Sequence, residues 1–138
     1  MILVDTDILI WVTRKDPQAC AFLDSFDEGV AISDVTYMEL IQGAKNKREA
    51  QAIDKTLKNM EVLRLPITTR ISEHAVSLVR RYFHSHSMQL ADALIAATAL
   101  EQGLIFATGN VKHFEVVEGL QLRPLVHQRG IPPTGMTE

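Results

Sequence analysis

The residues of this sequence that could do chemistry are carboxylates set in apolar surroundings, far apart along the chain. Asp5 follows an apolar run at the start, Glu39 comes shortly after a second apolar run, and Asp92 stands in a stretch otherwise free of charge. An unpaired carboxylate in apolar material is costly, so each needs a cation, a buried partner or a proton. Oxygen ligands suit Mg²⁺ or Mn²⁺ better than zinc, so the three acids indicate a site for a hard divalent cation.

Electrostatics favours a shared cation if these acids meet in the fold. Two carboxylates about 4 Å apart repel each other by about 4 kcal/mol at an effective dielectric constant of about 20. Ionised carboxylates grouped this closely therefore need a divalent ion to offset their repulsion.

Two of the acids also have simpler interpretations. Asp5 follows a predicted strand and could serve only as the N-cap of the next helix, a common role of Asp. Thr36 and Glu39 have the spacing of a T-x-x-E capping box, in which the glutamate bonds back to the Thr36 backbone and has no chemical role. Asp92 is harder to explain in this way, because on a helix it would share a face with apolar residues such as Ile95 and Ala96.

The hydrophobic pattern predicts the elements that would position these acids. Apolar runs predict strands over residues 2–4, 30–33, 62–65 and 104–107, with a candidate fifth strand over residues 122–125. Helical spacing and capping signals predict helices over residues 8–14, 17–26, 35–44, 49–60, 69–84 and 87–101, the last capped by Ser87 and stopped by Gly103. This order indicates an α/β fold, with a mostly parallel sheet of four to five strands between helical layers. Ligands of such sheets bind at the carboxyl ends of the strands, where Asp5 would lie.

Composition describes an ordinary globular protein. The chain has 138 residues, of which 46% are hydrophobic and 22% charged, and this is the size of one domain. It has no apolar run near the roughly 20 residues that cross a bilayer, no signal-peptide pattern, and a single cysteine, Cys20. We therefore expect a cytoplasmic protein with no membrane segment, disulfide framework or thiolate zinc site.

Net charge gives no support for a nucleic-acid partner, although local basic groups exist. The formal charge of −3 produces no overall basic field. The basic residues that could meet a phosphate backbone are Arg14, Lys15, Lys45 and Lys112, and their simplest interpretation is a solvated surface. A bound divalent ion would reduce the negative charge that a phosphate meets at the acids.

Four short motifs carry a family resemblance. They are Val4-Asp5-Thr6-Asp7, then Ser33 with Thr36 and Glu39-Leu40, then Asp92-Ala93-Leu94-Ile95-Ala96-Ala97, then Thr108-Gly109-Asn110-Val111-Lys112-His113-Phe114. In order and spacing they resemble the PIN-domain nucleases, and the whole set looks like the VapC-type toxins of bacterial toxin–antitoxin pairs. The resemblance covers roughly residues 1–126, and the motifs are specific as a set, although each alone is common.

The resemblance implies a three-layer αβα PIN-like nuclease domain over residues 1–127, with a catalytic quartet at its centre. Asp5, Glu39 and Asp92 match the first three members of the family's acidic quartet, and Asn110 takes the fourth position. The resemblance implies Mg²⁺ (or Mn²⁺) with Asp5, Asp92 and Glu39 as metal ligands. Because an amide is a neutral ligand, the site is one negative charge short of the full quartet, which argues against a tightly bound second metal and leaves the choice between one metal and two open.

Hydroxyl groups beside the acids also match the family pattern. Thr6 and Thr108 are expected to orient the carboxylates by hydrogen bonding. Asp7 would either add negative charge to the site or cap a helix. His113 stands where many relatives carry another Asp, and no metal is assigned to it.

The function implied is that of an endoribonuclease toxin that hydrolyses phosphodiester bonds in single-stranded or loop RNA with Mg²⁺, leaving 5′-phosphate and 3′-hydroxyl ends. Family likeness further implies a cognate antitoxin that inhibits the enzyme, DNA contacts made only through that antitoxin, and pairing of the toxin as a homodimer. Residues 128–138 have little apolar content and are expected to form a mobile C-terminal tail.

Two other functions stay open at this point. A strand followed by Asp5 and Asp7 also resembles the haloacid-dehalogenase phosphatases, whose first Asp is a phosphorylated nucleophile, but Leu9 and the short chain depart from that pattern. Alternatively, with Asn110 in the quartet and an acidic surface, the domain could be catalytically inactive and bind RNA or a protein without cutting.

Overall fold

A parallel sheet forms the centre of the computed structural model, which describes residues 1–130 and residue 132. The strand order is β3-β2-β1-β4-β5, and every neighbouring pair is parallel. The strands are β1 (Ile2–Val4), β2 (Val30–Ser33), β3 (Leu63–Leu65), β4 (Ile105–Thr108) and β5 (Leu122–Pro124). The predicted sheet is confirmed, including its fifth strand.

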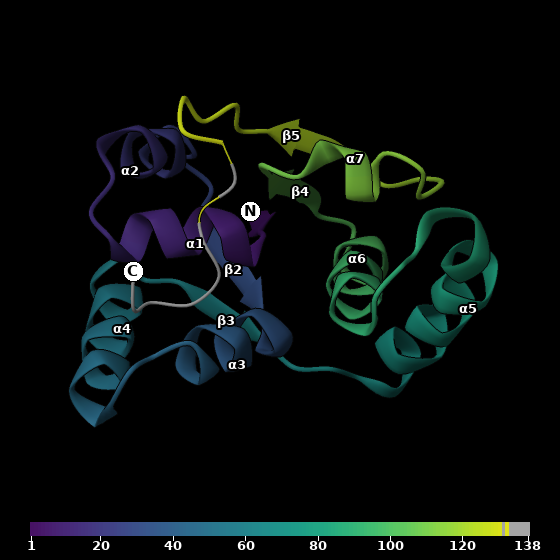
Figure 1. The fold of residues 1–138 in the computed structure, drawn as a ribbon, viewed down its shortest axis with the longest axis horizontal. Helices are drawn as coiled ribbons and strands as arrows, with labels where there is room; N and C mark the ends of the chain where they lie inside the picture. The colour runs from purple at the N-terminus through teal and green to yellow at the C-terminus, as the bar shows by residue number, and fades with distance from the viewer. Residues whose placement is uncertain (131, 133–138) are drawn as a thin grey trace.

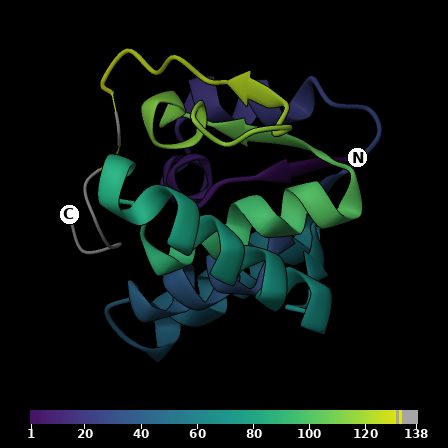
Figure 2. The same ribbon diagram turned by 90° about the vertical axis from the view of Figure 1, so that its right-hand side faces the viewer.

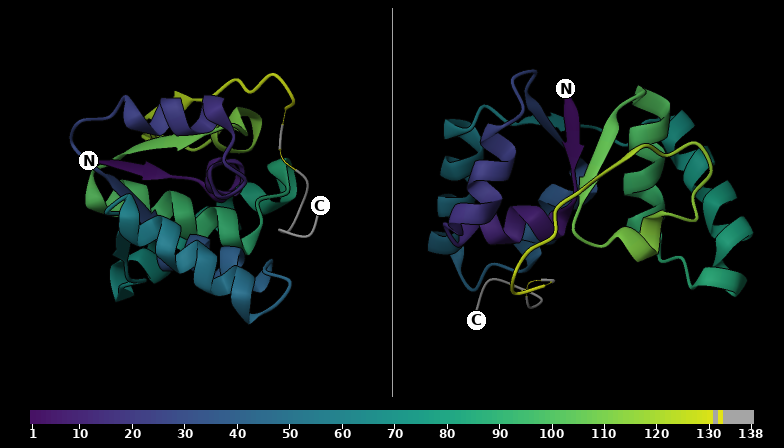
Figure 3. Two further views of the ribbon diagram at one scale, coloured as in Figure 1. Left: turned by 90° about the vertical axis from the view of Figure 1, so that its left-hand side faces the viewer. Right: turned by 90° about the horizontal axis from the view of Figure 1, so that it is seen from above.

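Helices cover both faces of this sheet (Figure 1). They are α1 (Thr6–Thr13), α2 (Pro17–Asp24), α3 (Asp34–Gln42), α4 (Lys47–Asn59), α5 (Thr69–His86), α6 (Leu90–Gln102) and α7 (Val111–Phe114). Figure 2 shows α5 and α6 in front of one face, and the left view of Figure 3 shows α2 and α4 in front of the other. The predicted three-layer αβα arrangement is therefore confirmed. No helix in the described part of the chain is long and apolar enough to cross a membrane.

The alternation of side chains along the central strand explains the two helical layers. Leu3 packs in the core that includes Ile71 of α5 and Ile95 of α6, while Val4 packs in the core on the opposite face with Leu9 of α1. All of these side chains are almost completely buried. Strands buried on both faces read as continuous apolar runs, which is why they could be recognised in the sequence.

The topology brings separate loops together at one edge of the sheet. Because β1 lies between β2 and β4 and all three run parallel, their carboxyl ends, Val4, Ser33 and Thr108, lie at the same edge. Asp5 directly follows β1, α3 directly follows β2, and Asn110 lies in the loop after β4. Residues from distant parts of the sequence can therefore meet there; the right view of Figure 3 shows β1 and β4 side by side.

Two of the predicted helix caps are wrong. The N-cap of α3 is Ser33, whose hydroxyl accepts a hydrogen bond from Val35 N, so Thr36 lies inside the helix and cannot form a capping box with Glu39. Ser87 does not cap α6, because it ends α5 in the left-handed conformation (φ 54°), and Gln89 is the N-cap of α6. The predicted stop at Gly103 is confirmed, since this residue ends α6 with φ 65°.

The predicted mobile tail over residues 128–138 lies partly outside the described residues, which omit residues 131 and 133–138. Its first residues contact the body of the domain. Gln128 N donates a hydrogen bond to Gln18 at 3.3 Å, Arg129 donates to Asp16 at 3.0 Å, and the Gly130 carbonyl accepts one from Trp11 at 3.3 Å. These contacts with α1 and α2 depend on side chains distant in sequence, so composition did not reveal them.

Candidate active site

Asp5 occupies the carboxyl end of the central strand and is 7% exposed. Its Oδ1 accepts a hydrogen bond from Thr6 N at 2.8 Å, so Asp5 is the N-cap of α1. Its Oδ2 accepts a hydrogen bond at 2.7 Å from the hydroxyl of Thr108, at the end of β4. A carboxylate oxygen can accept more than one hydrogen bond, so each oxygen keeps capacity for a further ligand. Helix capping is therefore only part of what holds Asp5 in place.

Thr108 links Asp5 to Asn110. Its side chain is fully buried, and its hydroxyl, besides donating to Asp5, accepts a hydrogen bond from Asn110 N at 2.9 Å. This contact fixes the backbone of Asn110, which precedes α7 and does not use its side chain to cap that helix. The predicted orienting hydroxyl of Thr108 thus contacts the first acid and holds the fourth quartet residue.

Glu39 lies inside α3 and is held by the hydroxyl of Thr6. That hydroxyl donates to Glu39 Oε1 at 2.6 Å and lies 3.1 Å from the Thr36 hydroxyl, which is fully buried. Because Thr6 follows Asp5 directly, the second acid of the motif set is joined to the first through one residue. Thr36, which the sequence suggested as a cap, instead supports this contact.

Asp92 lies in the first turn of α6 and contacts a histidine. Its side chain is 23% exposed, and its Oδ2 lies 3.5 Å from Nδ1 of His113 on α7. Asp92 is also close enough to Asp5 for its charge to raise the pKa of Asp5. The sequence assigned no metal to His113. Its position in the fourth motif was the one feature of the sequence that suggested a place near Asp92.

Burial dominates the electrostatics of this edge of the sheet. Burial, followed by the charge of Asp7, raises the pKa of Asp5 well above its usual range, although the hydrogen bonds from Thr108 and Thr6 partly offset this shift. Burial likewise raises the pKa of Asp92, and His113 partly offsets it. Such shifts indicate carboxylates that lack a compensating positive charge.

Asp7 ties the start of α1 to the loop after β4. Its Oδ1 accepts a hydrogen bond from Ile8 N at 2.7 Å, and its Oδ2 accepts one from Gly109 N at 3.0 Å. A Cβ atom on Gly109 would lie only 2.8 Å from Asp7 Oδ2, so this close approach requires glycine. Burial raises the pKa of Asp7 to about 6. The charge of Asp7 raises the pKa of Asp5, and the bond from Gly109 makes Asp7 an anchor of the loop that carries Asn110.

The predicted nucleic-acid contacts are spread over the surface. Lys112 is exposed on α7, close in sequence to Asn110. Arg14 and Lys15 follow the far end of α1, which at 1.5 Å per residue places them about 12 Å from its start. Lys45 is exposed in the loop after α3. Of these four basic residues, only Lys112 is therefore close in sequence to a residue of the candidate site, Asn110.

The donor set fits one hard cation with few protein ligands. Within residues 1–130 and residue 132, no three Asp, Glu, His or Cys side chains are arranged to share an ion as they stand. Mg²⁺, however, is commonly held by one or two carboxylates and completes its shell with water and phosphate oxygens. Asp5 and Asp92 can act in this way, because both are carboxylates whose ionised forms gain from added positive charge.

Comparison with known proteins shows the family of this chain. A family model described as PIN domain matches residues 2–120. Ribonuclease VapC10 of Mycobacterium tuberculosis is 42% identical over 90% of this chain and 92% of its own length. The chain belongs to the VapC ribonucleases of the PIN-domain family.

Two further proteins resemble the chain over most of its length. The tRNA(fMet)-specific endonuclease VapC of Shigella flexneri is 29% identical over 86% of this chain and 93% of its own. A toxin–antitoxin complex from Klebsiella pneumoniae contains a chain with 31% identity and a TM-score of 0.74, over 87% of this chain and 95% of that one. These comparisons favour neither the phosphatase nor the catalytically inactive binding module.

Proposed function

We propose that this protein is a divalent-cation-dependent endoribonuclease toxin that a cognate antitoxin inhibits. The observation that carries the proposal is the network around Asp5, in which Thr108 connects it to Asn110 and Thr6 connects it to Glu39. The similarity to a ribonuclease and to an endonuclease named for a tRNA supports RNA as the substrate.

In this proposal the acids have distinct roles. Asp5 and Asp92 would hold Mg²⁺ (or Mn²⁺) directly, and Glu39 and Asn110 would act on the ion directly or through water. Such an ion, when bound, lowers the pKa of an attached water and offsets charge on the phosphate. Thr6 occupies Glu39 Oε1, and Oε2 of the same carboxylate accepts the proton of the attacking water.

Orientation of the acids comes from their neighbours. Thr108 holds Oδ2 of Asp5, and Asp7 holds the backbone of Gly109, so the loop with Asn110 keeps its place during the reaction. The exposed Lys112 contacts the phosphate backbone beside the cut. Arg14, Lys15 and Lys45 contact more distant parts of the RNA.

Partners follow from the same proposal. The neighbouring structure from Klebsiella pneumoniae is a toxin–antitoxin complex, which supports a cognate antitoxin here. In this proposal the antitoxin would place a basic residue at the acids and would alone contact DNA. Action on cellular RNA places the protein in the cytoplasm.

A homodimer would cover apolar residues of the helical layer such as Phe83 and Leu90, which are 49% and 73% exposed. A monomer mass by light scattering at micromolar concentration would exclude the dimer.

The decisive test compares wild type, Asp92→Asn and a control on one RNA pool. Antitoxin-free proteins are incubated with Mg²⁺ or EDTA, and the product ends are mapped. We expect cuts with 5′-phosphate and 3′-hydroxyl ends that need Mg²⁺ and fall by about 10²–10³-fold in Asp92→Asn. The exposed Asp24→Asn at the end of α2 is the matched control and should cut like wild type.

The fold of Asp92→Asn should be intact, because the change removes a charge that burial disfavours. Full activity in that variant would remove Asp92 from the mechanism. Tight RNA binding without cleavage, indifferent to Mg²⁺, would instead indicate the binding module.

A further inference from the structure

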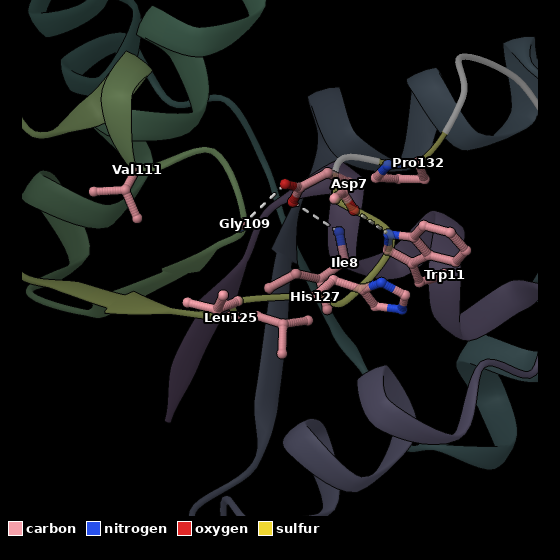
Figure 4. A pocket seen from close by; sticks show the side chains of 10 residues that line it. Asp7, Ile8, Trp11, Gly109, Val111, Leu125, His127 and Pro132 are labelled. Carbon is pink, nitrogen blue, oxygen red and sulfur yellow. Dashed lines mark hydrogen bonds between the residues drawn. The ribbon is translucent and has the colours of Figure 1, made fainter.

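A pocket of about 180 Å³ opens beside the acids, between α1, the loop after β4 and the segment that follows β5. Figure 4 shows Asp7 and Gly109 between Val111 and Leu125 on one side and Trp11, His127 and Pro132 on the other. A protein cavity of about 150 Å³ is enough to take a benzene-sized ring. The pocket therefore has room for one planar heterocycle and not for a stacked pair.

The walls of the pocket are held in place before any ligand arrives. The rings of Trp11 and His127 stack with centroids 4.0 Å apart and an angle of 5° between their planes. His127 Nε2 lies 2.7 Å from the buried Asp16 carboxylate, and Trp11 donates a hydrogen bond to the Gly130 carbonyl at 3.3 Å. Neither ring can turn away without breaking these contacts, so the site is preorganised, which lowers the cost of binding.

One end of the pocket accepts hydrogen bonds. Each Asp7 oxygen already accepts one backbone N–H, from Ile8 or Gly109, and each keeps capacity for a second donor. Apart from His127 and the indole N–H of Trp11, the remaining side chains of the walls are apolar and include Ile8, Val111 and Leu125. The chemistry thus suits a flat, mostly apolar molecule that presents N–H groups at one edge.

The pocket shares its framework with the candidate catalytic residues. Asp7 is two residues from Asp5 in the first turn of α1, and Gly109 directly precedes Asn110. A group in the pocket is therefore positioned by the same elements that hold the acids. In a nuclease, such a group belongs to a nucleotide close to the bond that is cut.

We propose that this pocket is a base-recognition subsite that takes one unpaired guanine of the RNA. Guanine has two adjacent N–H donors on its Watson–Crick edge, from N1 and the 2-amino group, which match the two oxygens of Asp7. Uracil places its single ring N–H between two carbonyl oxygens, which the Asp7 carboxylate repels. The inference rests on the proposed ribonuclease function and adds the base that the enzyme selects.

Trp11 allows binding to be measured without cleavage, because it is the only tryptophan of the chain. Antitoxin-free protein in EDTA is titrated with GMP, UMP and ribose 5-phosphate while Trp11 emission is recorded. We expect a saturable change with GMP, binding of UMP about 5- to 150-fold weaker, and no response to ribose 5-phosphate over the same range. Equal responses to GMP and UMP would overturn the inference.

A second variant pair tests the pocket itself. Val111→Phe places a larger side chain at the pocket wall, and Val76→Phe adds the same group at an exposed position of α5. Only Val111→Phe should weaken GMP binding, with a loss of at least about tenfold. If Val111→Phe does not fold, the comparison of GMP with UMP binding to wild type still tests whether the pocket selects guanine.

Cleavage mapping separates this inference from the proposed function. Wild type should cut at a fixed distance from a guanine, and Val111→Phe should cut with that preference lost. Mg²⁺-dependent cleavage with no flanking preference and no GMP response would overturn the subsite and leave the ribonuclease. Saturable GMP binding without any RNA cleavage would support the subsite and contradict the nuclease. An emission change caused by the antitoxin but by no nucleotide would assign the pocket to a protein and overturn the inference.

Discussion

Thr108→Val removes one hydroxyl from the centre of the site while keeping the shape of the side chain. The fully buried hydroxyl donates to Asp5 Oδ2 at 2.7 Å and accepts from Asn110 N at 2.9 Å. A hydrogen bond to a charged group contributes about 1.5–3 kcal/mol and a neutral one about 0.5–1.5 kcal/mol. We therefore expect the variant to lose about 2–4 kcal/mol of unfolding free energy at pH 8.

The loss of unfolding free energy in Thr108→Val should also depend on pH. This dependence distinguishes the loss of a bond to Asp5 from the loss of any other buried hydroxyl. The Thr108 hydrogen bond favours the ionised form of Asp5, so its removal raises the pKa of Asp5 further and costs less at pH 5 than at pH 8. Urea unfolding followed by Trp11 fluorescence measures both values. Thr98→Val is the matched control, since the buried Thr98 hydroxyl donates only to the Leu94 carbonyl, at 2.8 Å. Equal losses in the two variants, or a loss from Thr108→Val that does not change with pH, would refute the reasoning.

The remaining predictions concern the charge and the close contacts of the same site. Asp7 binds its proton more tightly in the folded protein, because its pKa rises from 3.8 to about 6. Its contribution to stability is thus fully present below about pH 4 and is lost as pH rises through about 6, a change of about 3 kcal/mol that urea unfolding in EDTA should show. A stability that is flat over this range would contradict it. Mg²⁺ at 100 times its dissociation constant should stabilise wild type by about 2.7 kcal/mol in thermal unfolding, and Asp92→Asn should show a much smaller gain. Gly109→Ala should lose about 1–3 kcal/mol because its Cβ would meet Asp7 Oδ2 at 2.8 Å, whereas Gly43→Ala, at a φ of −79°, should unfold at nearly the wild-type urea concentration.

The fold could be predicted because its signals are local. The three central strands β1, β2 and β4 are short, mostly apolar runs, whereas the edge strands β3 and β5 each carry an arginine. Helix α2 begins at Pro17 after the capping residue Asp16, as its sequence indicates. The order of strands and helices then leaves a parallel sheet as the simple arrangement. These features depend only on residues that are neighbours in sequence, so the sequence alone predicts them.

The first residue of a helix was harder to predict than a strand, because several residues near each helix start can act as the N-cap. Ser33, Asp34 and Thr36 are all capping types, and the capping-box spacing of Thr36 to Glu39 favoured Thr36, which is wrong. The choice is made by tertiary contact, since Thr36 is fully buried beside the Thr6 hydroxyl and Ser33 is left to cap α3. A residue that looked like a cap was in fact part of the site.

The acids of the site could be named from motifs, but their connections could not. Thr108 lies 103 residues from the carboxylate that it contacts, and His127 lies 111 residues from Asp16. Such pairs form only because β1, β4 and β5 are adjacent in the sheet. The pocket wall made by Trp11 and His127 therefore has no signature in either segment alone.

Asp5 and Asp7 use one arrangement twice, and this links catalysis to base selection. In each, one oxygen accepts the N–H of the next residue, and the other accepts a donor from the end of β4, the Thr108 hydroxyl or the Gly109 N–H. The buried Asp5 and the half-buried Asp7 repel each other, but together they hold α1 against the loop that carries Asn110. Asp7→Asn should therefore change Mg²⁺ affinity and guanine preference together, whereas Val111→Phe should change only the preference. Calorimetric Mg²⁺ titration and cleavage mapping on both variants measure this, and an unaltered Mg²⁺ affinity in Asp7→Asn would show that the two sites are independent.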